Sequence, residues 1–67
     1  MNGGSAESLQ RAEELLERLR GKLEQLERLA EEGDADAAVD DLAEIAEIAR
    51  DLEAEIGRAR TAADAGR

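Results

Sequence analysis

The chain of 67 residues contains no cysteine, no histidine, no proline and no aromatic residue. It therefore lacks a thiol nucleophile, the commonest general base, any disulfide and the usual ligands of transition metals. The hydroxyl groups of Ser5, Ser8 and Thr61 have no imidazole to activate them. We expect a protein that is not an enzyme and that binds no metal, no cofactor and no small molecule.

Positive charge and long apolar runs are also scarce. Nine Lys and Arg oppose eighteen Asp and Glu, a net charge of -9, so the surface should repel phosphate and anionic lipid. No stretch approaches the roughly 18 apolar residues of a membrane span, and Met-Asn-Gly-Gly-Ser at the start lacks the features of a secretion signal. We expect a cytoplasmic protein with no direct contact to nucleic acid or membrane.

The residues that are abundant, Ala, Glu, Leu, Arg and Asp, are typical of long helices. In the first half, apolar residues alternate in steps of three and four, which is typical of a helix packed lengthwise on another helix. This predicted seam comprises Leu9, Ala12, Leu16, Leu19, Leu23, Leu26 and Ala30. Leu15 and Leu29 are expected beside it, which makes the stripe wide enough for more than one neighbouring helix.

The second half repeats the pattern with smaller side chains. Its predicted seam comprises Ala35, Ala38, Leu42, Ile45, Ala49, Leu52, Ile56, Ala59 and Ala63, flanked by Val39, Ala46 and Ile48. Small alanines opposite large leucines allow two helices to approach closely. The two halves are therefore expected to pack against each other.

A short turn is predicted between the halves, with Gly33 as a left-handed helix cap and either Asp34 or Asp36 as the residue that caps the next helix. So short a connection makes the helices antiparallel. We predict an all-α, coiled-coil-like hairpin with a helix over about 5–32, a turn over about 33–35 and a helix over about 36–64. Ser5 is the expected first cap, and the chain ends are expected to fray.

A lone hairpin should not suffice, because two helices that touch along one line bury little apolar surface relative to the entropy of ordering them. We therefore expect the hairpin to be completed into a helical bundle, either by a second copy or by a helical partner. The residues expected to carry these contacts are Leu9, Leu15, Leu16, Leu19, Leu23, Leu26, Leu29, Val39, Leu42, Ile45, Ile48, Leu52 and Ile56, with Gly33 and Asp34 at the turn.

A run of six carboxylates without a base follows the turn: Asp34, Asp36, Asp40, Asp41, Glu44 and Glu47. Ala37, Ala38 and Val39 stand where a calcium loop would have ligands, so a calcium site is not expected. The run is either a solvated helix face or a binding surface that imitates DNA phosphates towards a basic target.

Two segments resemble the small, non-catalytic subunit of bacterial exonuclease VII: Leu23-Glu24-Gln25-Leu26, and the turn Glu31-Glu32-Gly33-Asp34. The resemblance covers about half of the chain. It implies a chain without catalytic residues that packs on long helices of a large nuclease subunit. The chain departs from that family after Asp34, where Ala35 to Ala38 replace a leucine-rich start, and it has no aromatic residue.

The sequence thus predicts a non-catalytic helical-hairpin interaction subunit, with an exonuclease VII-like small subunit as its specific form. Two alternatives stay open. One is a self-associating helical bundle, natural or designed, with no further activity. The other is an acidic inhibitor or DNA mimic.

Overall fold

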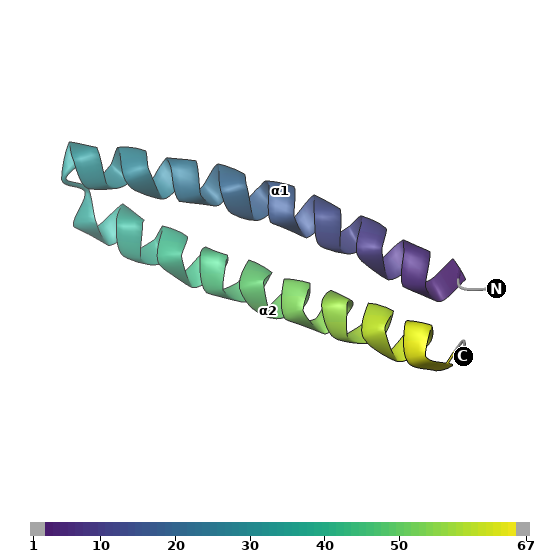
Figure 1. Cartoon of the computed structure of the whole chain (residues 1–67). Helices are drawn as coiled ribbons and strands as arrows, with labels where there is room; N and C mark the ends of the chain where they lie inside the picture. Colours follow the sequence, from purple (N-terminus) through teal and green to yellow (C-terminus); the bar gives the residue numbers. More distant parts are fainter. Residues whose placement is uncertain (1–2, 66–67) are drawn as a thin grey trace.

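The computed structural model, which describes residues 3–65, consists of two helices, α1 (Gly3–Glu32) and α2 (Ala35–Ala65). They run antiparallel, side by side, along a rod whose Cα atoms extend 51 × 14 × 10 Å (Figure 1). The predicted all-α hairpin is confirmed. The helix bounds lie within two residues of the predicted ones, but α1 begins before Ser5, so Ser5 lies inside the helix and is not its cap.

The turn consists of two residues with complementary roles. Gly33 has a φ of 74°, which is the left-handed conformation that glycine adopts without steric cost. Its N–H donates to the Ala30 carbonyl at 3.2 Å, and the Asp34 N–H donates to the Leu29 carbonyl at 3.0 Å, as in a Schellman cap. Asp34 then caps α2, because its Oδ1 accepts a hydrogen bond from the Ala37 N–H at 3.2 Å.

The two helices pack through one row of residues from each, which we call the inner row. On α1 its spacing is again three and four: Ser8, Ala12, Leu15, Leu19, Lys22, Leu26 and Leu29. On α2 it comprises Ala38, Asp41, Ile45, Ile48, Leu52, Glu55, Ala59 and Ala62. All of these are buried or half-buried, and Ile48 is the most buried apolar residue, with 4% of its surface exposed.

The inner rows of both helices differ from the predicted seams. On α1, Leu15 and Leu29 were expected beside the contact and lie within it, whereas Leu9, Leu16, Leu23 and Ala30 were expected within the contact and are exposed. On α2, Ile48 was expected beside the contact and lies within it, whereas Leu42 and Ile56 were expected within the contact and are exposed. The apolar stripe of α1 is wider than a single neighbouring helix can cover. The orientation that α1 adopts about its own axis places Ser8 and Lys22 in the contact with α2, where Lys22 forms an ion pair with Asp41.

Candidate functional site

Among the described residues, six large apolar side chains remain exposed when the hairpin has formed. Between 45% and 64% of their surface is accessible, which separates them clearly from the inner row. They are Leu9, Leu16, Leu23, Val39, Leu42 and Ile56. The other seven residues of the predicted contact set lie in the inner row: Leu15, Leu19, Leu26, Leu29, Ile45, Ile48 and Leu52.

Most of these exposed residues share one face of the hairpin. Leu9, Leu16 and Leu23 each directly follow an inner-row residue of α1, and Leu42 and Ile56 do the same on α2. One residue advances a helix by about 100°. Because the helices are antiparallel, this step turns both rows towards the same side of the hairpin. We call this surface the open face; Val39 lies at its α2 edge.

Two ion pairs fix the level of one helix against the other. Arg11 Nε donates to Glu55 Oε2 at 3.2 Å, and Lys22 Nζ lies 3.6 Å from Asp41 Oδ1. Residues near these pairs are therefore level along the rod. The open face then has four layers: Leu9 with Ile56, Leu16 with Ala49, Leu23 with Leu42, and Ala30 with Ala35.

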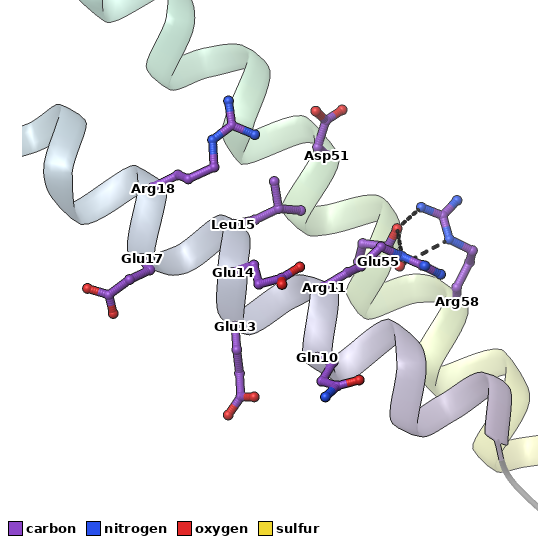
Figure 2. Close-up of a pocket in the computed structure, with 10 residues that line it drawn as sticks. All are labelled: Gln10, Arg11, Glu13, Glu14, Leu15, Glu17, Arg18, Asp51, Glu55 and Arg58. Atoms are coloured by element: carbon purple, nitrogen blue, oxygen red, sulfur yellow. Dashed lines mark hydrogen bonds and ion pairs between the residues drawn. The ribbon is translucent and has the colours of Figure 1, made fainter.

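The opposite side of the hairpin, the polar face, has a different chemistry. It carries an open groove between the helices, lined by Gln10, Arg11, Glu13, Glu14, Leu15, Glu17, Arg18, Asp51, Glu55 and Arg58. Figure 2 shows Arg11 and Arg58 converging on Glu55 from the two helices, while Glu13 and Glu17 point away from α2. Leu15 is the single apolar side chain of this lining and points towards α2.

Ion pairs perturb the titration of three groups on this face. The hydrogen bond from Arg58 holds the pKa of the Glu55 carboxyl below its usual value, with help from the charge of Arg11 and against the effect of burial. The same bond raises the pKa of Arg58. The hydrogen bond to Glu44 is the main cause that raises the pKa of Lys22, and the nearby Asp41 carboxylate adds to it. In each case the direction of the pKa shift means that the ion pair stabilises the charged form of the group.

The groove offers little for catalysis. Its buried carboxylate, Glu55, is compensated by two guanidinium groups, so it is held ionised and is a poor proton donor near neutral pH. Of the described hydroxyl groups, Ser8 lies buried in the inner row and Thr61 is exposed. Across residues 3–65, no three carboxylates come together in a way that could hold a metal ion.

The acidic run after the turn is divided by the fold. Asp41 is buried, with 2% of its surface exposed, and Lys22 of α1 pairs with both Asp41 and Glu44. Asp34 caps α2. The run therefore does not present six equivalent carboxylates to a basic target. Its other three members, Asp36, Asp40 and Glu47, are exposed on the surface of α2.

Five inner-row residues were not foreseen as contact residues: Ser8, Lys22, Asp41, Glu55 and Ala62. The signal for all of them was in the spacing. Ser8 and Lys22 continue the three-four steps of α1, and Asp41, Glu55 and Ala62 continue those of α2. The opposite charges of Lys22 before the turn and Asp41 after it are the further clue that an antiparallel pairing provides.

Comparison of the chain with protein-family models, with curated proteins and with solved structures gave no match. In the described part of the chain, neither helix has an apolar segment long enough to cross a membrane.

Proposed function

We propose that the chain is a helical-hairpin protein interaction unit that docks through its open face onto another helical surface. The observation that carries this proposal is the one-sided distribution of exposed apolar side chains. Leu9, Leu16 and Leu23 on α1 and Leu42 and Ile56 on α2 share one face, while ion pairs occupy the other. Contiguous exposed apolar surface of this kind is typical of protein interaction sites.

Burial of the apolar side chains of the open face favours docking. Full burial of a side chain of this size contributes about 1.5–3 kcal/mol. Since the six side chains are already about half buried by the fold, covering the remainder would contribute on the order of 5 kcal/mol before the cost of association. Removing one central leucine should therefore weaken docking strongly.

The proposal is tested with the neutral dye Nile red and with two variants of equal charge change. Leu16→Glu places a carboxylate in the open face, and Gln25→Glu places one at the heptad position shared by Arg11 and Arg18 on the polar face. We expect the native chain either to bind the dye as a monomer or to exclude it in an assembly. Leu16→Glu should abolish whichever behaviour is seen, and Gln25→Glu should preserve it.

A monomeric native chain that neither binds the dye nor responds to Leu16→Glu would contradict the proposal. Circular dichroism of each variant verifies that the helices are retained. Since Leu16 is already half exposed in the hairpin, its replacement removes little packing between α1 and α2.

A further inference from the structure

We infer that the occupant of the open face is a second copy of this chain, docked with its turn at the opposite end of the rod. The inference rests on the proposed function and makes it specific. The result is a four-helix bundle in which α1 lies on α1 of the partner and α2 lies on α2 of the partner, in antiparallel pairs.

The area of the open face suits such a dimer. The face is as long and as wide as the hairpin, 51 × 14 Å between Cα atoms, or about 700 Å². A stable protein interface of standard size buries about 800 Å² on each partner. A second hairpin has the same length and width, so it covers the whole face and leaves no apolar layer exposed at either end.

The sizes of the side chains in the layers favour opposite turns. The layer at the open end of the rod contains Leu9 and Ile56, and the layer nearest the turn contains Ala30 and Ala35. With turns at opposite ends, the large layer of one copy meets the alanine layer of the other, and the two middle layers meet each other. Every layer of the bundle then has two or three large side chains out of four, which suits helices at even spacing.

With both turns at one end, each layer would meet its own counterpart. The layer of Leu9 and Ile56 would then contain four large side chains, and the layer of Ala30 and Ala35 would contain four alanines. Overpacking at one end and a void at the other both destabilise a core.

Charge favours the same orientation. Segment 34–47 has six carboxylates and no base, whereas segment 50–65 has Arg50, Arg58 and Arg60 among its charges. Turns at one end would gather the two base-free segments there. Turns at opposite ends separate them along the rod and place each one beside the arginine-bearing end of the partner's α2.

The orientation is measured by double electron–electron resonance on the full chain with a nitroxide at a single introduced cysteine, since the native chain has none. Glu32→Cys places the label on the exposed last residue of α1. Opposite turns predict a separation of about 40 Å, because the two Glu32 residues are then about 25 residues apart along the helices at about 1.5 Å per residue, whereas adjacent turns predict about 20 Å, two helix diameters. The exposed Glu17→Cys near mid-length is the control, because it gives a short separation in either dimer.

A second measurement uses a size exchange within the open face. Leu9→Ala and Ala30→Leu should each weaken the dimer, by about tenfold in Kd or more, through a cavity and through overpacking. The double variant should recover most of this loss, because Leu9 of one copy faces Ala30 of the other. Sedimentation equilibrium provides the Kd values, and independent effects of the two changes would contradict the orientation.

The possible results separate the two proposals. A dimer with the long separation supports the inference, and a dimer with the short one overturns the orientation. A monomer that binds Nile red, and loses this binding with Leu16→Glu, overturns the second copy as occupant but supports the proposed interaction function. The occupant of the open face would then be a different helical protein, as the resemblance to the exonuclease VII small subunit implies. A monomer that ignores the dye overturns both.

Discussion

Lys22 Nζ lies 3.6 Å from Oδ1 of Asp41, a carboxylate with 2% of its surface exposed and with no hydrogen bond to either oxygen from the described residues. The pair sits between α1 and α2 at a level where both neighbouring inner-row layers are apolar. A buried ion pair seldom adds stability over a well-packed apolar pair, but it can specify which alignment of two helices forms. Here the alignment it favours leaves the open face uncovered.

This relationship predicts a contrast between single and double replacement. Lys22→Met should lower the thermal midpoint, because Asp41 would remain buried without a cation. Lys22→Met combined with Asp41→Leu should raise it above the native value, since two apolar side chains then fill the same space. Thermal unfolding followed by circular dichroism checks both. A single variant as stable as the native chain would show that water, and not Lys22, compensates Asp41.

A second prediction concerns pH. The Arg58 hydrogen bond and the Arg11 charge lower the pKa of Glu55 from its ordinary value of 4.5. The pair therefore stabilises the folded chain above about pH 4.5, and this stabilisation is lost as the pH falls through the lower folded value. The difference in urea midpoint between the native chain and Glu55→Gln should be present at pH 7 and shrink below pH 4.5. A difference that does not change with pH would mean that Glu55 acts by packing alone.

The glycines give a third prediction with opposite signs. Gly33→Ala should destabilise the hairpin by about 1–2 kcal/mol, because a Cβ is strained at a φ of 74°. Gly57→Ala should stabilise it by about 0.5–1 kcal/mol, since Gly57 lies inside α2 and a Cβ there meets nothing within 4 Å. Urea unfolding measures both. Equal effects of the two changes would mean that the turn is not left-handed.

A fourth prediction isolates the cap of α2. Asp34→Ala removes the acceptor of the Ala37 N–H and should cost about 1 kcal/mol. Asp36→Ala removes the same charge from the first turn of α2 but no such hydrogen bond, and should cost less than about 0.5 kcal/mol, the helix-dipole contribution at an exposed site. If the two variants unfold at the same urea concentration, charge and not capping explains the aspartates of the turn.

The sequence was sufficient to predict the hairpin, its turn and the residues of its apolar stripe. The three-four spacing predicted two long helices, and Gly33 followed by Asp34 marked the reversal, because each residue has a backbone role that few others fill. What could not be predicted was which residues of each stripe face the other helix of the hairpin. Leu15 and Leu16 are equally apolar and adjacent, and a helical pattern alone places the seam on either.

This choice depends on polar residues that the apolar pattern leaves out. Lys22 faces α2 because it forms ion pairs with Asp41 and Glu44 of that helix, and Arg11 forms an ion pair with Glu55 of α2. These long-range pairs select the rotation of α1 that turns Leu16 and Leu23 outwards. Hydropathy alone carries no information about such a choice, so the open face emerges only when both helices are considered together.

The hairpin brings Gly3 and Ala65, the outer bounds of its helices, to the same end of the rod, far from Gly33 (Figure 1). A short flexible linker could therefore join the two ends, and the loop at Gly33 could be cut to give new termini, with α1 and α2 keeping their antiparallel arrangement. Such a circular permutant would exchange the order of the helices and reverse the end from which a fused domain projects. Two proteins fused next to Gly3 and Ala65 would be held side by side, so the hairpin would bring the attached domains together at one end of the rod.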